Sequence, residues 1–497
     1  MPELVMSIDA GTTGITVLVI GPAGDVRGRS YAEFSQGFPR PGWMEHDAQE
    51  IWGLVPSLMG AALNNASVEY ADVAAIGITN QRETTVLWDR ASSKPVAPAI
   101  VWQCRRSTGI CERLRSEGLE DDLRSRTGLV LDAYFSATKL VWYFEELDGV
   151  RERAESGELA FGTIDSWLVW NLTGGEHATE HSNASRTMLY NLESTSWDDW
   201  ILGQLGIPAA ILPEIRPSSG RFGTTRPELT GGRPIPISGI AGDQQAALFG
   251  QACFDPGMAK NTYGTGSFVL MNTGDELTHS KRGLLTSAAW DVGRGVSFVL
   301  EGSIFVTGAA VQWLRDGLGV IEKASDTEAL ARSVPDAGGV YLVPAFVGLG
   351  APHWDPYARG ALFGLTRGTT TGHLARAVVE SMAFQTRDVV EAMTADAGTP
   401  LEELRVDGGA SVMDLLCQFQ DDQLGVPVRR PAMEETTALG TAYLAGLAEG
   451  VWSSETEITE RWTAAAEYEP KAERDEMDER YEEWCRAVER SKGWAKP

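Results

Sequence analysis

Short apolar runs alternate along the chain with stretches whose apolar residues have helical spacing. Residues 4–9 are apolar enough for a buried strand, turn residues follow at 10–14, and a second β-rich run covers 15–20. This strand, turn and strand predict a β-hairpin at the start of an α/β fold. Further strands are predicted at 26–34, 73–79, 84–87 and 99–106, and helices at 48–62, 373–393 and within 161–172, the last capped by Asp165 or Ser166.

The second half of the chain repeats the opening pattern. A Gly-Thr-Gly turn at 264–266 is followed by F-V-L-M-N, as the turn at 10–14 is followed by I-T-V-L-V-I. Two hairpins of one kind, each beginning its own half, predict two related domains that face each other across a cleft. Residues 183–236 are rich in Asn, Ser, Pro and Gly, which we interpret as loops.

These patterns predict an N-terminal domain at 1–252, a C-terminal domain at 253–455 and a helical tail at 456–497. At 497 residues the chain is too long for one ordinary core, which agrees with two large domains. In the tail, helical spacing predicts one apolar face formed by Met477, Tyr481, Trp484 and Val488.

The composition excludes several classes of protein. The formal net charge is −27, which argues against nucleic acid and anionic membranes as partners. No apolar run approaches the roughly 20 residues that cross a bilayer, and the start lacks the basic region of a signal peptide, so we expect a cytoplasmic protein. Its five cysteines show no C-x-x-C spacing, so they are interpreted as reduced thiols.

Residues 239–268 place two chemical devices close together. Asp243 and Gln244 stand at the start of a helix-like segment, where a carboxylate and an amide could take a proton and orient hydroxyl groups. The turn at 264–266 could wrap N–H groups around phosphate. A base beside a phosphate cradle indicates phosphoryl transfer to an alcohol, although Asp at a helix start is also a common cap and Gly-Thr-Gly a common turn.

The first hairpin offers a similar cradle. Its tip, Gly-Thr-Thr-Gly at 11–14, carries N–H and hydroxyl donors, and Asp9 at the end of the strand could meet Mg²⁺ or its water. Arg82 and Glu83 lie in a predicted loop between two apolar strands, where they suit a substrate with several hydroxyl groups. The alternatives are a local turn at Asp9 and an ordinary salt-bridged loop at 82–83.

With these residues the sequence resembles the carbohydrate kinase family that contains glycerol, xylulose and gluconate kinases, and its glycerol kinases above all. The likeness covers roughly residues 4–450. Its motifs are G-I-T-N-Q-R-E-T-T at 77–85, A-I-V-W-Q-C-R-R at 99–106, G-I-A-G-D-Q-Q-A-A-L-F-G-Q at 239–251, K-N-T-Y-G-T-G at 260–266, G-A-L-F-G-L at 360–365, H-L-A-R-A-V-V-E at 373–380 and R-V-D-G-G-A at 405–410.

The resemblance implies two ribonuclease-H-like domains of the actin and hexokinase type, with substrate bound mainly by the first and nucleotide by the second. It implies ATP-dependent, Mg²⁺-assisted phosphorylation of glycerol to sn-glycerol 3-phosphate, with Asp243 as base, in a homodimer or homotetramer. The implied glycerol-binding residues are Thr12, Arg82, Glu83, Trp102, Tyr134, Asp243, Gln244 and Phe268; the implied nucleotide-binding residues are Thr12, Thr13, Gly14, Thr16, Thr265, Gly308, Gln312, Gly409 and Met413; and Asp9 is the implied metal residue.

The sequence departs from the family at three of these positions. Gly14 replaces a serine, Thr16 replaces an arginine expected near the phosphates, and Met413 replaces an asparagine expected near adenine. Two other functions stay open at this point. One is a kinase for a related polyol or ketose, and the other is a nucleotide switch of the actin or chaperone type that has no phosphoryl acceptor.

Overall fold

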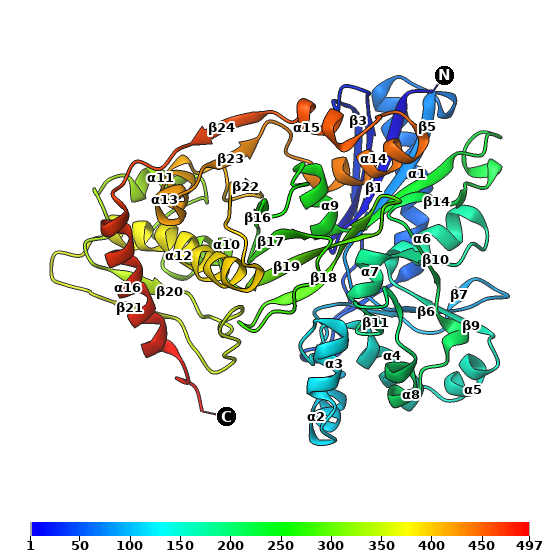
Figure 1. Cartoon of the computed structure of the whole chain (residues 1–497), viewed down its shortest axis with the longest axis horizontal. Coiled ribbons are helices and arrows are strands. Elements are labelled where there is room, and N and C mark those ends of the chain that lie inside the picture. The colour runs from blue at the N-terminus through cyan, green and yellow to red at the C-terminus, as the bar shows by residue number, and fades with distance from the viewer. Residues whose placement is uncertain (1, 497) are drawn as a thin grey trace.

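The computed structural model describes residues 2–496 and contains two large mixed sheets, one in each half of the chain (Figure 1). The first has the strand order β14-β15-β5-β1-β2-β3 and the second the order β18-β19-β17-β16-β22-β23-β24. The strands of the first sheet are β1 (Leu4–Ala10), β2 (Gly14–Ile20), β3 (Val26–Glu33), β5 (Val73–Asn80), β14 (Ser219–Thr224) and β15 (Pro236–Gly242). Those of the second are β16 (Ala259–Tyr263), β17 (Ser267–Gly274), β18 (Leu285–Asp291), β19 (Val296–Ile304), β22 (Leu404–Asp407), β23 (Val428–Pro431) and β24 (Ala464–Tyr468).

The two sheets share one topology. In the first, the antiparallel β1-β2 hairpin is extended by antiparallel β3 on one side and by parallel β5 and β15 on the other, and antiparallel β14 closes the edge. In the second, β16 and β17 form the hairpin, β19 extends it, β22 and β23 run parallel, and β24 closes the edge. This duplication confirms the predicted pair of related α/β domains.

Helices cover these sheets, and their apolar faces agree with the sequence pattern. Ile51, Val55 and Leu58 of α1 are buried in the first core, and α12 contributes Val378, Met382 and Val389 to the second. The helices of eight or more residues are α1 (Ala48–Ala66), α2 (Thr108–Ser116), α3 (Glu120–Thr127), α4 (Ser136–Glu146), α6 (Ile164–Thr173), α9 (Asp243–Gly250), α12 (Thr371–Ala397), α13 (Asp414–Leu424), α14 (Thr436–Glu449) and α16 (Arg474–Ser491).

Helix α14 comes from the second half of the chain but packs on the first sheet (Figure 1). Glycines make this close approach possible: a Cβ at Gly77 of β5 would lie 2.3 Å from the Thr441 carbonyl oxygen, and one at Gly239 of β15 would lie 2.3 Å from the Ala445 nitrogen. Ser7 and Thr441 are also joined by a 3.0 Å hydroxyl hydrogen bond. The two halves of the chain are therefore packed tightly together here.

Residues 456–497, predicted as a helical tail, contain a strand as well as helices. Strand β24 is the edge of the second sheet, because its backbone pairs with β23. Helix α16 buries Met477, Trp484 and Val488 in the second core, with Tyr481 packed against it, which confirms the predicted apolar face. Strand β24 and helix α16 thus belong to the second domain, whereas Ile458 and Trp462 at the start of the segment pack with residues of α14 and the first sheet.

Three other local predictions are wrong in part. The predicted strand at 99–106 ends after Ile100, since β8 covers only Ala99–Ile100. The α6 N-cap is Thr163 and not Asp165 or Ser166, because the helix begins at Ile164 and both predicted residues lie inside its first turn; the Asp165 carboxylate instead accepts hydrogen bonds from the Thr163 and Thr179 hydroxyls. The stretch 183–236 contains short strands and helices, among them α8 (Asp199–Leu205) and β14, that loop-like composition hid.

Candidate active site

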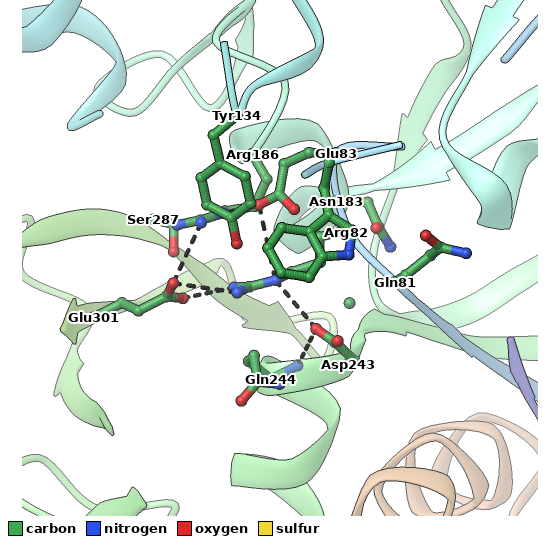
Figure 2. Close-up of polar contacts among 12 residues, drawn as sticks. Gln81, Arg82, Glu83, Tyr134, Asn183, Arg186, Asp243, Gln244, Ser287 and Glu301 are labelled. Atoms are coloured by element: carbon green, nitrogen blue, oxygen red, sulfur yellow. Dashed lines mark hydrogen bonds and ion pairs between the residues drawn. The ribbon is translucent and has the colours of Figure 1, made fainter. Parts of the chain in front are cut away.

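Arg82 and Glu83 lie between β5 and β6 (Val86–Asp89), in a loop that is almost completely buried. The Arg82 guanidinium donates to Glu301 of β19 through Nη1 and Nη2, at 2.6 and 3.1 Å. Arg186, which follows α7 (His181–Ser185), donates from Nε to Glu83 at 2.6 Å and lies 3.3 Å from Glu301. Two arginines and two glutamates from both domains thus form one buried charge cluster (Figure 2).

The charges in this cluster set one another's ionisation. Although burial raises the pKa of Glu301, Arg186 and Arg82 outweigh it and hold that pKa at about 2. Burial keeps the pKa of Glu83 above its ordinary value, against the pull of Arg186 and Arg82. The pKa of Arg82 stays well above its ordinary value because its carboxylate neighbours outweigh burial. The loop therefore presents a fixed guanidinium to the site.

Asp243 begins helix α9 beside this cluster. Its Oδ1 lies 3.2 Å from Arg82 Nε and accepts the Gln244 backbone N–H at 2.7 Å (Figure 2). Its Oδ2 has no hydrogen-bond partner among residues 2–496, and the side chain is 30% exposed. One carboxylate oxygen is thus held in place while the other is free to accept a proton from a bound hydroxyl group.

Gln244 is positioned by a buried lysine. Lys260 of β16 donates to the Gln244 side-chain oxygen and to the Thr262 hydroxyl, the latter at 2.8 Å. Burial lowers the pKa of Lys260 to about 8, with Asp407 and Asp243 acting in the opposite direction. The second domain therefore fixes two predicted substrate residues of the first, Gln244 through Lys260 and Arg82 through Glu301.

The aromatic residues predicted to contact the substrate lie around the same point. The Tyr134 and Trp102 rings meet edge to face with centroids 5.4 Å apart, and the Phe268 ring lies 6.0 Å from the Arg82 guanidinium carbon. Trp102 also donates from Nε1 to the Thr12 hydroxyl at 3.0 Å. The structure thus brings the predicted glycerol residues from six separate segments into one region.

A second buried lysine ties two of these segments together. Lys139 of α4 donates to the backbone carbonyls of Glu83, at 3.1 Å, and Tyr134, at 2.7 Å. The Ser136 hydroxyl donates to the same Glu83 carbonyl at 3.0 Å. Glu83 has a φ of 60°, an uncommon conformation for a side-chain-bearing residue that these donors help to hold. Burial lowers the pKa of Lys139 to about 7.

We expect Lys139→Met to raise the KM for the hydroxyl substrate about tenfold and to leave the KM for nucleotide unchanged. The variant keeps a straight side chain but removes hydrogen bonds worth about 1 kcal/mol each, so Glu83 and Tyr134 lose their common anchor. Steady-state kinetics with each substrate varied measures the effect. Lys94→Met, at an exposed lysine, is the control, and equal substrate KM values in the two variants would contradict this role.

The tips of the two hairpins present unpaired N–H groups, as a phosphate site requires. Among residues 2–496, the N–H groups of Gly11, Thr12 and Thr13 have no hydrogen-bond partner, and neither does that of Thr265. The Gly264 and Thr265 carbonyls point instead toward the start of helix α10 (Gly308–Gln312). They accept the N–H groups of 307–309 at 3.0 Å.

The remaining nucleotide predictions lie in different surroundings. Gln312 is exposed, and a Cβ at Gly409 would meet open space. Met413, at the start of α13, is 7% exposed and belongs to the second core, whereas Val412 beside it is 63% exposed. Val412 is therefore the side chain that this turn exposes.

The structure explains one departure from the family. Gly14 is fully packed on β2, and a Cβ there would lie 2.7 Å from the Tyr31 ring and from the Ala32 carbonyl. Tyr31 is 46% exposed and can turn away, so the Ala32 backbone carbonyl is the contact that a serine at position 14 would meet unless β3 shifted. Thr16 pairs with Asp9 on β1 and with Tyr31 on β3, so it stands beside the carboxylate that the sequence assigns to metal.

Asp9 suits a cation. Burial raises its pKa to about 7, and the nearby charges of Asp243 and Glu435 act in the same direction. Residues 2–496 contain no group of three His, Cys, Asp or Glu side chains arranged around a metal. A lone carboxylate is nevertheless sufficient for Mg²⁺, which usually keeps several waters and binds through one or two carboxylates and the substrate phosphates.

Sequence reasoning missed Arg186, Glu301, Lys139 and the role of Lys260. Lys260 lies in a motif that was noted for its glycine turn, and Glu301 is one charge in an otherwise apolar strand. Arg186 is the sixth residue of the block H-S-N-A-S-R-T at 181–187, which is buried throughout. A charged residue inside an apolar strand is the one signal that could have found Glu301, because such a charge needs a buried partner.

Both halves of the chain match one family of proteins. Residues 4–250 match the N-terminal domain, and residues 259–449 the C-terminal domain, of the FGGY family of carbohydrate kinases. The fold and the two hairpins define a kinase of this class, and the chain belongs to that family.

Particular relatives are similar along their whole length. The chain is 60% identical over 496 residues to a glycerol kinase of Trichlorobacter lovleyi, with 100% of both chains covered. It is 56% identical over 493 residues to one of Carboxydothermus hydrogenoformans, with 99% of both covered. The crystal structure of Plasmodium falciparum glycerol kinase with ADP superposes with a TM-score of 0.94 at 33% identity, and 98% of each chain is covered.

Proposed function

We propose that this protein is a glycerol kinase, which uses ATP to phosphorylate glycerol to sn-glycerol 3-phosphate. One observation carries the proposal: the Asp243 carboxylate has one oxygen held by Arg82 and Gln244 and the other free, in a protein whose two hairpin tips carry unpaired N–H groups. The full-length similarity to glycerol kinases supports glycerol as the acceptor.

The reaction follows from this arrangement. The terminal hydroxyl of glycerol donates to the free oxygen of Asp243, and Arg82 and Glu83 bind the other hydroxyls, as donor and acceptor. Trp102 and Phe268 cover the carbon edge. The hydroxyl oxygen attacks the γ-phosphorus, the bond to the bridging oxygen of ADP breaks, and the hydroxyl proton passes to Asp243. Since phosphoryl transfer has a loose transition state, positioning matters more than the strength of the base.

The N–H groups of the two tips bind the phosphates in this scheme, at Gly11–Thr13 and Thr265. Asp9 is the residue that would hold Mg²⁺, through water, and the ion would supply neutralisation of charge on the phosphates. Assembly as a homodimer or homotetramer and a cytoplasmic location stay predictions. Among residues 2–496, no helix combines the length and hydropathy needed to span a membrane.

A panel of acceptors tests the choice of substrate. We expect ADP release to rise sharply with glycerol and to be far lower with xylulose, gluconate or larger polyols, because Arg82 and Glu83 are buried and held by Glu301 and Arg186 and so cannot rearrange for a longer acceptor. Preference for a ketose would favour the related sugar kinases, and turnover that no acceptor stimulates would favour a nucleotide switch.

A further inference from the structure

The backbone carbonyls of residues 10–13, at the tip of the first hairpin, all accept hydrogen bonds from other parts of the protein. Those of Ala10 and Thr13 accept backbone N–H groups of Gln81 and Phe34, at 2.9 and 3.3 Å. Between them, the Gly11 carbonyl accepts the Gln81 side-chain amide at 3.0 Å, and the Thr12 carbonyl accepts that of Gln36 at 3.1 Å. With its carbonyls fixed on the protein side, the tip leaves its own N–H groups free.

One histidine joins the two glutamine side chains. His46, in β4 (Glu45–His46), has Nε2 2.8 Å from Gln36 Oε1 and Nδ1 3.3 Å from Gln81 Nε2. It is 1% exposed, and its ring meets the Phe34 ring edge to face with centroids 4.9 Å apart. The first hairpin is thus joined through His46 to the loop that carries Arg82 and Glu83.

The bonds around His46 determine its tautomer. Gln81 Nε2 is a donor, so Nδ1 of His46 must accept, and Gln36 Oε1 is an acceptor, so Nε2 must carry the proton. The Gln81 amide is fixed independently by the Gly11 carbonyl, which can only accept and therefore requires the amide NH₂ group on its side; the Gln81 Oε1 then accepts the Thr84 hydroxyl at 2.8 Å. This neutral tautomer is the one that allows the NH₂ groups of Gln36 and Gln81 to donate to the Thr12 and Gly11 carbonyls. If either side-chain amide were rotated by 180°, its oxygen would face the hairpin carbonyl and the hydrogen bond would be lost.

The surroundings of the ring keep it neutral. Burial lowers the pKa of His46 to about 4. A second proton would lie on Nδ1 and point at the NH₂ group of Gln81, which cannot accept it. The ring is thus a fixed donor and acceptor at neutral pH.

We infer that His46 is a positioning residue for the nucleotide phosphates, acting through Gln36 and Gln81 on the tip of the first hairpin. The inference rests on the proposed function, because the ligand of that tip is the phosphate chain of ATP. In this role His46 does not contact glycerol or ATP. It orients the side chains of Gln36 and Gln81, which bind the Thr12 and Gly11 carbonyls, so that the N–H groups of the tip face the phosphates.

The test uses three variants of the full chain. His46→Leu removes both bonds, His46→Asn keeps an acceptor near the place of Nδ1, and His46→Gln keeps a donor near the place of Nε2. We expect His46→Leu to raise the KM for ATP and the Kd for ADP in calorimetry about 10- to 100-fold, since each lost bond is worth about tenfold. The other two variants should fall between wild type and His46→Leu, and the KM for glycerol should stay within about twofold of the wild-type value.

His177→Leu is the matched control. His177 is also an uncharged histidine with both ring nitrogens bonded, Nε2 at the Phe161 carbonyl and Nδ1 at Arg90, but it lies away from the hairpin. A role limited to packing would give similar losses of thermal stability in both leucine variants and no change in nucleotide binding. That result would overturn the inference.

Nitrogen NMR of labelled histidine supplies a second readout. The signal assigned to His46, by its absence from the His46→Asn spectrum, should be that of a neutral ring with an unprotonated Nδ1; His177, whose Nε2 lies at a carbonyl and whose Nδ1 lies at Arg90, should give a second such signal that persists in the variant. A protonated Nδ1 on His46 would contradict the inference. Wild-type turnover with glycerol tests the proposed function separately. An inactive wild type would defeat that function, whereas an active wild type with unchanged ADP binding in His46→Leu would defeat only the inference.

Discussion

Asp243→Asn should lower kcat about 10²- to 10⁴-fold, because the amide keeps the shape of the side chain but cannot accept the hydroxyl proton. The amide oxygen can still accept the Gln244 N–H, as Oδ1 does now at 2.7 Å. Nucleotide affinity should change little, since the tips of the two hairpins and not Asp243 carry the free N–H groups. Single-turnover kinetics at saturating glycerol and ATP measures the loss in the chemical step.

Asp47→Asn is the control for a purely structural role. Asp47 caps α1 and accepts the Gln49 N–H at 2.8 Å, so its replacement tests the loss of a helix-start carboxylate outside the site. We expect it to leave kcat unchanged. Near-normal kcat in a correctly folded Asp243→Asn variant would reduce Asp243 to a carboxylate that only orders the start of α9.

Glu301→Ala should produce the largest loss of stability, about 3–5 kcal/mol, because it leaves the buried guanidinium groups of Arg82 and Arg186 without their shared partner. Glu301 is completely buried and receives two hydrogen bonds from Arg82. The KM for glycerol should rise as well, since Arg82 loses the contact that fixes it. The stability of Glu301→Gln, which keeps the size of the side chain but not its charge, should lie between those of wild type and Glu301→Ala.

Thermal unfolding compares these variants with Glu449→Gln. Glu449 is 13% exposed and accepts hydrogen bonds from Ser238, at 2.7 Å, and from an Arg221 side chain that is 69% exposed, so its pair borders on solvent and we expect a smaller loss, about 1–2 kcal/mol, in the control. Equal midpoints for Glu301→Gln and Glu449→Gln would contradict the importance of the buried cluster.

The effect of Glu301 should also depend on pH. Its folded-state pKa of about 2 lies below the value of about 4.3 in an unfolded chain, so its contribution is fully present above that unfolded value. The contribution is lost as pH falls toward the folded value. The gap in midpoint between wild type and Glu301→Gln should therefore be widest near neutral pH and narrow as pH falls below about 4.

Periodicity alone predicted much of the fold. The strands of the first hairpin, helix α1 and the apolar face of α16 are regular enough for local pattern to identify them. The pairing of β24 with β23 and the packing of α14 on the first sheet could not be predicted, because both depend on contacts between segments far apart in the chain.

The site likewise contains residues that the sequence identifies and residues that only the structure identifies. Asp243, Arg82 and Glu83 stand in motifs whose chemistry is legible from sequence. Glu301 and His46 act through partners that only folding brings near: Glu301 lies 219 positions from Arg82, and His46 lies 35 from Gln81. A residue that holds another residue in place can stand out in the sequence, as the charge of Glu301 does in its strand, but its role cannot be assigned until the partner is known.

The measurement that tests the central claim most directly is the stoichiometry of products after a single addition of ATP with excess glycerol. Phosphorus NMR should show one glycerol 3-phosphate for each ADP, and a stereospecific dehydrogenase should oxidise all of it as the sn-3 isomer. Inorganic phosphate in place of the ester, or ADP release that glycerol does not increase, would contradict the assignment of this protein as a glycerol kinase.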